Sequence, residues 1–269
     1  MLPRDMAGRA QQDRVTDPRP VPHSNRSIPP GTGVLALAPD GDREAFLDIL
    51  SHELRTPVTT IYGGAELLAT RSLDAGRRRT LIADVRAEAD RLYRLVEDLV
   101  VIARSERDGL RPVGEPVAIG RLAIAAIDLA TAHHPGARIW FDGTSDAVAD
   151  GADEGYVRHV LRNLLDNAIR YGASAGAIDV IVTETDSDVA VRVIDRGEAP
   201  TTGADPFALS SSMPLTAAGR ACGGIALYVA DLLVRALHGR MWATPARPAG
   251  AEFGFSLARP GFVRPSTAS

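Results

Sequence analysis

The sequence is poor in several residue types, and each shortage narrows the kind of protein it can be. None of its 30 basic residues is lysine, and 34 acidic residues bring the formal net charge to −4. This balance gives no sign of the clustered basic surface that nucleic-acid binding needs. The single cysteine, Cys222, excludes an internal disulfide framework and favours a reducing compartment.

Long apolar runs are also missing. No stretch reaches the roughly 20 apolar residues that span a bilayer, and the first residues lack the apolar core of a signal peptide. We therefore expect a cytoplasmic protein that has no direct membrane span and no nucleic-acid partner.

Helical periodicity is the strongest pattern that is present, and it occupies residues 42–107. Apolar residues recur there at three- and four-residue steps in two runs, separated by a polar break at residues 71–79. Two long helices joined by a short loop form an antiparallel hairpin. One hairpin cannot cover both apolar stripes, whereas two hairpins can do so as a four-helix bundle. The pattern therefore predicts a homodimer.

The rest of the chain divides by composition. Residues 1–41 are rich in proline, arginine and glycine without periodicity, which predicts a disordered leader or, alternatively, a short docking segment. Residues 108–116 hold glycine and proline and are expected to form a linker, and residues 261–269 a tail. Residues 117–260 mix helical and strand patterns, so the predicted fold class is α+β, with the helical hairpin followed by an α/β sandwich. The expected helices are 119–134, 154–172 and 223–239, and the expected strands are 137–143, 177–186, 188–197 and two more before the tail.

The string SHELRTP, residues 51–57, holds the first candidate for chemistry. His52 and Thr56 are four residues apart and share a helix face, while Glu53 adjoins His52. A neutral imidazole is a competent nucleophile near pH 7, and a nearby carboxylate can raise its basicity. Pro57 removes a helical hydrogen bond and is expected to bend the helix. The alternative is a polar, solvated helix face with an incidental proline.

The string HVLRNLLDNAIRYG, residues 159–172, holds the second candidate. Asn163 and Asn167 are four apart on one helix face, with Arg170 and Tyr171 close by. Asparagine carbonyl oxygens suit Mg²⁺, which uses few protein ligands and relies on phosphate and water. The alternative is an amphipathic helix whose asparagines happen to be exposed.

Two glycine-containing strings give weaker signals. Asp195 ends an expected strand and Gly197 follows it, which also fits an ordinary turn. Gly223 and Gly224 open an expected helix, whose amides could meet phosphate at its positive end. The remaining histidines, His159 among them, are expected to be solvated or capping, and the two tryptophans, Trp140 and Trp242, to lie in the core.

Together these strings resemble the motifs of bacterial two-component sensor histidine kinases, in the same order and on the expected elements. Residues 42–107 resemble the dimerisation and histidine-phosphotransfer domain of that family. By this resemblance His52 is the phosphoacceptor, Glu53 the assisting base, and Thr56 the residue that positions water for dephosphorylation of a partner response regulator.

Residues 117–260 resemble the catalytic ATP-binding domain of the same family, a GHKL-type fold. The resemblance implies that Asn167 ligates Mg²⁺, Asn163 lies near the γ-phosphate, Arg170 meets phosphate and Tyr171 lies beside the nucleotide. It also implies that Asp195 reads adenine. Gly197 then allows close backbone approach, and Gly223 and Gly224 form the second glycine box. The implied cofactors are ATP and Mg²⁺, and the implied partners are a second copy of the chain and a response regulator.

Departures from the family pattern keep other functions open. Ala199, Cys222 and Ala226 stand where the family usually has glycine, and an added Cβ could crowd the nucleotide or stiffen its lid. A dimeric scaffold or response-regulator phosphatase with weak kinase activity is therefore the alternative to a kinase. A GHKL-type serine kinase or ATPase would fit residues 117–260, but it leaves the hairpin without a role.

Overall fold

The computed structural model describes residues 40–172, 176–197, 205–208, 224–246 and 249–261. Several sequence predictions lie outside these residues: the leader up to residue 39, nearly all of the tail, and Ala199, Cys222 and Gly223.

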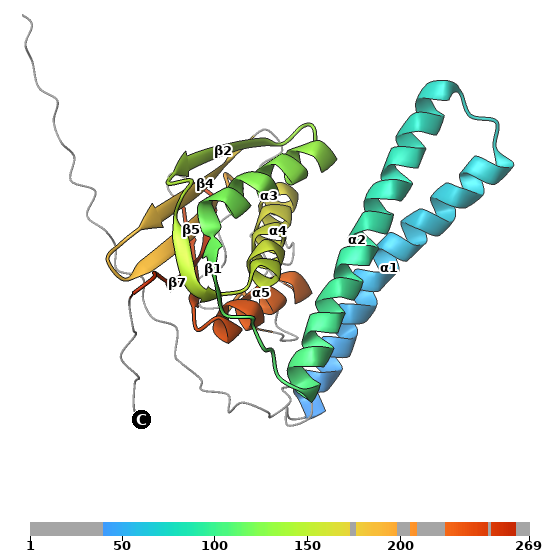
Figure 1. Cartoon of the computed structure of the whole chain (residues 1–269). Coiled ribbons are helices and arrows are strands. Elements are labelled where there is room, and N and C mark those ends of the chain that lie inside the picture. Colours follow the sequence, from blue (N-terminus) through green and yellow to red (C-terminus); the bar gives the residue numbers. More distant parts are fainter. Residues whose placement is uncertain (1–39, 173–175, 198–204, 209–223, 247–248, 262–269) are drawn as a thin grey trace, which may run out of the picture.

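The N-terminal part of the described chain is an antiparallel pair of long helices (Figure 1), α1 (Asp40–Thr70) and α2 (Ala75–Arg107). The loop between them is shorter than the predicted break at 71–79, because α2 already begins at Ala75. Asp74 explains the early start: its side chain accepts hydrogen bonds from the backbone N–H groups of Gly76 and Arg77. An aspartate N-cap stabilises a helix by about 1 kcal/mol, which favours helix in the arginine-rich turn that follows.

α1 and α2 pack closely at Gly64, where the absence of a side chain leaves room for α2. A Cβ added at Gly64 would lie 2.4 Å from a methyl group of Val85, closer than packed carbon atoms tolerate. Pro57 lies inside α1, which is assigned as one continuous helix from Asp40 to Thr70.

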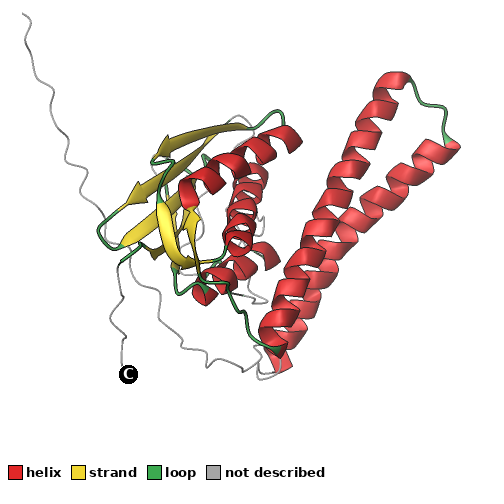
Figure 2. Cartoon of the chain, in the orientation of Figure 1, coloured by secondary structure: helices red, strands yellow, loops and turns green. Residues whose placement is uncertain are grey.

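The C-terminal half is a layer of three helices on one face of a sheet, which confirms the α+β prediction (Figure 2). The helices are α3 (Ile119–His133), α4 (Glu154–Tyr171) and α5 (Ile225–Ala236). The main sheet has the strand order β2-β4-β5-β7-β6, with β2 and β4 parallel and the other neighbours antiparallel. Its strands are β2 (Arg138–Gly143), β4 (Ala177–Glu184), β5 (Asp188–Ile194), β6 (Arg240–Pro245) and β7 (Ala251–Ala258).

Alternation along the strands decides which face of the sheet the helices cover. In β5, Val189, Val191 and Val193 are buried while the residues between them are partly exposed. Such a period of two directs every second side chain to the same face. The valines lie in one core with the apolar face of α4, which includes Leu161 and Leu164.

Two short strands were not predicted, because their compositions are poor in strand formers. They are β1 (Glu115–Ala118) and β3 (Val148–Ala152), which pair antiparallel in a separate two-stranded sheet. β1 contains proline, and β3 contains aspartate and glycine, residues that are depleted in strands. The observed start of β1 falls inside the predicted linker 108–116.

The prediction that both tryptophans lie in the core was wrong for Trp140, which is 62% exposed on the edge strand β2. Trp242 is partly buried: its ring lies over Gly254, and its Nε1 donates to Glu252. β6, which carries Trp242, is also an edge strand, so the difference lies in the cover that β7 gives to the Trp242 ring.

The hairpin and the α/β layer meet along α2, α4 and α5, and α3, α4 and α5 lie between the sheet and the hairpin in Figure 1. Buried residues of α2, such as Leu95 and Ile102, belong to the same apolar core as those of α4 and α5. The contact brings the SHELRTP string of α1 to the same region as α4.

Candidate functional site

The SHELRTP string presents its residues in two directions. His52 and Thr56 are both exposed, as their shared helix face predicts. Glu53 is turned inward and its side chain is 23% exposed. Its Oε2 accepts a hydrogen bond of 2.8 Å from Arg91 of α2 and lies 4.0 Å from Nη1 of Arg170 on α4. The carboxylate next to the candidate nucleophile thus faces two guanidinium groups.

The two asparagines of α4 are buried, so the alternative of an exposed polar face is excluded. Asn163 is 2% exposed and Asn167 is 7% exposed, on a helix that begins at an Asp153 N-cap. Asn163 donates from Nδ2 to the carbonyl oxygen of Ala226, 2.9 Å away, and to Oδ1 of Asp98, 3.1 Å away. A buried amide with defined partners has one orientation, which suits a ligand-binding role better than a solvated one.

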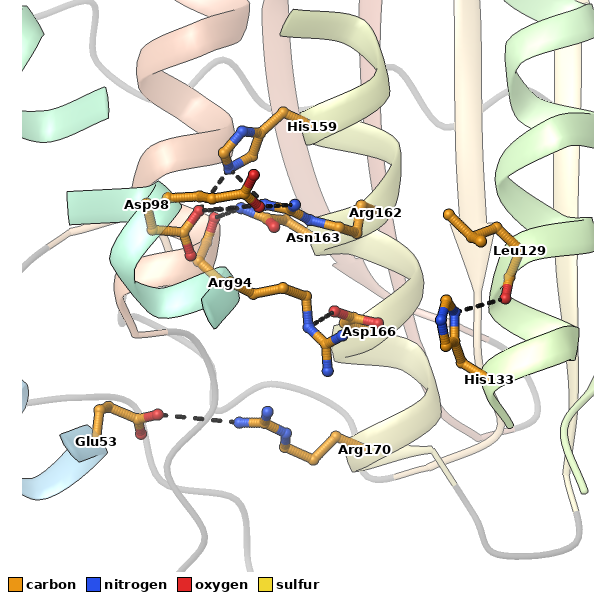
Figure 3. Close-up of polar contacts among 12 residues, drawn as sticks. Glu53, Arg94, Asp98, Leu129, His133, His159, Arg162, Asn163, Asp166 and Arg170 are labelled. Carbon is orange, nitrogen blue, oxygen red and sulfur yellow. Dashed lines mark hydrogen bonds and ion pairs between the residues drawn. The ribbon is translucent and has the colours of Figure 1, made fainter. Parts of the chain in front are cut away.

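A pocket joins these two groups of residues across the boundary between hairpin and α/β layer. Figure 3 shows several of its charged residues, with Glu53 on one side and Arg170 on the other. The hairpin lines it with Glu53, Arg91, Arg94 and Leu95; α4 lines it with Asn163, Asp166, Asn167, Arg170 and Tyr171; and α5 with Ile225 and Ala226. Of the predicted residues, Glu53, Asn163, Asn167, Arg170 and Tyr171 therefore meet there, whereas His52 and Thr56 are not among the lining residues.

Three arginines and two acids give the pocket a mixed, partly paired charge. Arg94 contacts Asp166 at 2.9 Å, and Arg91 and Arg170 share Glu53. Arginine is well suited to phosphate because its planar fork donates two parallel hydrogen bonds. An anionic phosphate that entered the pocket would compete with Glu53 and Asp166 for these guanidinium groups.

Asp195 lies directly after β5 and is 2% exposed. Burial raises the pKa of its carboxyl, whereas backbone N–H groups of Gly197 and Ala251 and the charge of Arg196 act in the opposite direction. Both N–H groups donate to Oδ1, at 2.7 and 3.4 Å. The two hydrogen bonds hold the carboxyl in one orientation, and its burial disfavours the ionised form. Carboxyl groups with a pKa raised in this way are typical of functional positions.

Glycines bring the backbone close to Asp195 on two sides. A Cβ at Gly197 would lie 2.2 Å from the carbonyl oxygen of Tyr171, so no side chain fits there. At Gly250, φ is +112° and a Cβ would lie 2.0 Å from the carbonyl oxygen of Asp195. The sequence drew attention to Gly197 but not to Gly250, which looks like any glycine before a strand.

Gly224 is the N-cap of α5 and has a φ of +93°, a backbone conformation that residues other than glycine rarely adopt. The helix therefore begins with a glycine that the backbone itself requires. No described side chain caps this end, and Ile225 and Ala226 of the first turn line the pocket. The first-turn N–H groups of a helix attract phosphate, so this end is suited to an anion.

The polar side chains of α2 that face α4 were missed by sequence reasoning. Asp98 is 3% exposed, and its Oδ1 lies 2.6 Å from Nε2 of His159. The prediction of a solvated or capping His159 was therefore wrong. A carboxylate inside the apolar run LVEDLVVIA was the available signal, because an unpaired charge is costly to bury.

Magnesium is the metal for which the pocket offers donors. No three His, Cys, Asp or Glu side chains in the described part of the chain come together as a metal cluster. Mg²⁺ does not need one, since it keeps several waters and takes one or two protein oxygens together with phosphate. Asn167, which lines the pocket, carries an amide oxygen that could serve in this way.

Two family models match the chain in the order of these elements. Residues 42–108 match the "His Kinase A (phospho-acceptor) domain", and residues 152–261 match the "Histidine kinase-, DNA gyrase B-, and HSP90-like ATPase". Together the two matches take in more than half of the chain. The chain belongs to the two-component sensor histidine kinases. The match over the hairpin accounts for the segment that a GHKL-type serine kinase or ATPase would leave without a role.

Curated histidine kinases are similar over most of the chain. The adaptive-response sensory kinase SasA of Synechococcus sp. (strain JA-2-3B'a(2-13)) is 29% identical over 222 residues, which is 80% of this chain and 59% of that protein. The probable sensor histidine kinase TcrY of Mycobacterium tuberculosis is 29% identical over 221 residues, 79% of this chain and 45% of that protein. The chain thus spans about half the length of these relatives.

Solved histidine kinases share the fold. ShkA, determined at full length in complex with AMPPNP, is 28% identical with a TM-score of 0.53, covering 81% of this chain and 46% of that one. Acinetobacter baumannii AdeS is 22% identical with a TM-score of 0.56, covering 78% of this chain and 98% of that one.

Ala226 gives a test of the suggestion that the glycine boxes have lost function. It lies in the first turn of α5, inside a regular helix, where alanine is favoured over glycine by about 1 kcal/mol. We therefore expect Ala226→Gly to leave ATP affinity within about twofold and to lower the thermal midpoint slightly. Titration with a fluorescent ATP analogue measures the first and calorimetry the second. A large gain in affinity would instead support the weak-kinase alternative.

Proposed function

We propose that the chain is an ATP-dependent protein-histidine kinase of a two-component system, which phosphorylates His52 and then donates the phosphoryl group to an aspartate of a response regulator. One observation carries the proposal: buried amides of α4 share a pocket with Glu53, the residue next to His52. Membership of the kinase family supports the type of reaction, and the pocket supports the choice of residues that carry it out.

The nucleotide is proposed to lie between α4 and the start of α5. Asp195 would accept from the adenine amino group through Oδ2, since its Oδ1 is occupied by two backbone N–H groups. Arg170 would meet the phosphates and Tyr171 would lie beside the nucleotide, with Gly224 at the positive end of α5. Asn167 would hold Mg²⁺, which neutralises charge on the phosphate oxygens. ShkA, which has been solved with AMPPNP, supports this assignment by its similarity.

The phosphoryl transfer itself needs few protein groups. A free nitrogen of His52 forms a bond to the γ-phosphorus while the bond to the ADP oxygen breaks, and Glu53 assists by accepting the imidazole proton. Positioning and charge stabilisation supply most of the acceleration in reactions of this type. Thr56 lies on the exposed face with His52 and would position water for dephosphorylation of the response regulator.

His52 faces away from the pocket that Glu53 lines, so transfer requires α1 and α4 to move relative to each other. The ion pair that ties α1 to α4, between Glu53 and Arg170, is long at 4.0 Å, and its arginine is 41% exposed. Pairs of this kind are weak and exchange readily. A conformational step before phosphoryl transfer is therefore part of the proposed mechanism.

A homodimer is proposed because the hairpin leaves a large apolar surface uncovered. Its exposed large hydrophobic residues are Leu47, Val58, Tyr62, Leu67, Ile82, Tyr93, Val96 and Val100. So many large apolar side chains exposed on one pair of helices are typical of an interaction surface. A second hairpin would cover it in a four-helix bundle.

The proposed second partner is a response regulator, in the cytoplasm. ThkA, which has the same fold with a TM-score of 0.55 at 20% identity, has been solved in complex with the response regulator TrrA. None of the described helices combines the length and the apolar character needed to cross a membrane.

The decisive experiment is incubation of the purified protein with γ-labelled ATP and Mg²⁺. We expect a protein-bound label that is acid-labile and alkali-stable, as a phosphorus–nitrogen bond would be, and that moves to a response regulator on addition. A folded dimer that acquires no label would favour the scaffold or phosphatase alternative.

Asp195→Asn separates the binding role of this residue from a structural one. Because burial raises the pKa of Asp195 above its unfolded value, the unfolded chain loses this proton first as pH rises. The ionised carboxylate therefore lowers stability at pH values above its folded pKa, and the neutral amide avoids that cost.

We expect Asp195→Asn to bind adenine nucleotides at least tenfold more weakly, because an amide can turn its N–H₂ toward the adenine amino group. We expect its thermal midpoint at pH 8 to be equal to or above that of the unmodified chain. A variant that loses stability at pH 8 and keeps nucleotide affinity would assign Asp195 a structural role only.

A further inference from the structure

Asp98 connects the two halves of the molecule through a nearly completely buried carboxylate. It belongs to α2 of the hairpin, is 3% exposed, and contacts three residues of α4, namely His159, Asn163 and Arg162 (Figure 3). Its Oδ1 lies 2.6 Å from Nε2 of His159 and accepts a 3.1 Å hydrogen bond from Nδ2 of Asn163. Glu97, its neighbour, forms an ion pair with Arg162. A buried charge is retained at a cost unless its partners are well placed, so this cluster fixes the geometry of both helices.

The chemistry of its partners determines how the amide of Asn163 is turned. Nδ2 of Asn163 faces two oxygen atoms, Oδ1 of Asp98 and the carbonyl oxygen of Ala226. A carboxylate and a carbonyl can only accept, so the side with two acceptors must be the –NH₂ group. Both amide hydrogens are then used, and the carbonyl oxygen Oδ1 of Asn163 remains as the group offered to the pocket that Asn163 lines.

We infer that Asp98 is a positioning residue for the phosphoryl-transfer site: it holds the amide of Asn163 so that Oδ1 is presented to the hydrated Mg²⁺ of the bound nucleotide. This inference rests on the proposed function, since it assigns a purpose to Asn163 within that site. It differs from the family motifs in that the orienting group comes from the phosphotransfer hairpin and not from the ATP-binding half.

Contact between the hairpin and the ATP-binding part therefore controls the orientation of the Asn163 amide. When α2 lies against α4, both hydrogens of Asn163 are bound and its orientation is single. When the halves separate, Asp98 leaves and only the bond to Ala226 remains, so the amide can rotate about its last side-chain bond. The site is then complete only when the hairpin that carries His52 is docked.

The test is Asp98→Ala in the full chain, measured as the autophosphorylation rate against ATP and Mg²⁺ concentration. Loss of an orienting partner typically costs 10- to 100-fold, so we expect the maximal rate to fall about tenfold or more. The Mg²⁺ concentration for half-maximal rate should rise, whereas nucleotide binding without Mg²⁺ should change less than about twofold, because Asp195 is untouched. Asp98→Asn keeps an acceptor for Asn163 and should recover part of the rate.

Glu97→Gln is the matched control, because it removes the adjacent ion pair to Arg162 and leaves in place the hydrogen bond that Asn163 donates to Asp98. We expect it to lower the rate by less than about threefold, as removal of a partly exposed ion pair does. If it lowered the rate as far as Asp98→Ala, the effect would come from docking alone and the inference would be overturned.

A double-mutant cycle with Asn163→Ala tests whether Asp98 acts through Asn163. If it does, Asp98→Ala adds less than about twofold to the loss caused by Asn163→Ala, whereas independent roles would multiply. Asp98→Asn replaces Asp98→Ala in the cycle if the alanine variant does not fold.

An unchanged or raised rate in the folded Asp98 variants overturns the inference, and a raised rate would mean that the cluster restrains the kinase. Absence of label in the unmodified chain would instead contradict the proposed function itself.

Discussion

Replacement of His52 by glutamine is expected to abolish autophosphorylation while leaving the dimer and nucleotide binding intact. Glutamine is similar in size and polarity, but its amide nitrogen is not nucleophilic, so no phosphorus–nitrogen bond can form. His52 is exposed, and a surface substitution of this kind changes stability by less than about 0.5 kcal/mol. The measurement is the amount of label per chain after incubation with γ-labelled ATP and Mg²⁺, together with the dimer fraction by light scattering.

His133→Gln is the control for this experiment. His133 is another exposed histidine, whose Nδ1 lies 3.0 Å from the carbonyl oxygen of Leu129 on α3, away from the pocket. The control should take up as much label as the unmodified chain. Label that persists in His52→Gln would show that the phosphoacceptor is a different residue.

Asn167→Ala is expected to reduce Mg²⁺-dependent ATP binding by tenfold or more, in line with the usual cost of removing a group from a metal site. The side chain lines the pocket with Arg170 and Tyr171, and its oxygen is the proposed Mg²⁺ ligand. Binding without Mg²⁺ should change little, because the adenine contact at Asp195 is separate. Titration of a fluorescent ATP analogue with and without Mg²⁺ measures both quantities.

Arg158→Ala provides a comparison on the same helix. Arg158 is 56% exposed and pairs only with Glu154 one turn earlier among the described residues, so its loss should leave binding unchanged. If Asn167→Ala bound nucleotide with unaltered Mg²⁺ dependence, the metal would have to be held elsewhere and the role proposed for α4 would be wrong.

Local patterns in the sequence predicted most of the fold because they reflect local physics. The 3.6-residue period of α4 and the two-residue period of β5 each follow from one buried face, and both elements lie where they were expected. The start of α2 was placed too late because Asp74, its N-cap, was read as part of a polar break. β1 and β3 depend on pairing with each other, which their compositions do not indicate.

The candidate site was predicted in part, because motifs record residue identity but not residue contact. Asn163 and Asn167 were predicted from the sequence string 159–172, and they line a common pocket with Glu53. Arg91, Arg94 and Asp98 come from an unremarkable amphipathic helix, and their importance depends on docking against α4, which no spacing rule describes. The exposure of Trp140 likewise depends on packing, since Trp242, on the opposite edge strand, is partly covered by residues of β7.

The different directions of His52 and Glu53 make access of His52 to the pocket depend on how α1 turns. Successive residues of an α-helix point about 100° apart, so rotation of α1 about its axis by roughly that angle would bring His52 to the position that Glu53 occupies. Sliding α1 along its axis would leave Glu53 on the same side. We therefore expect access of His52, the proposed phosphoacceptor, to depend on torsion of this helix more than on its axial displacement.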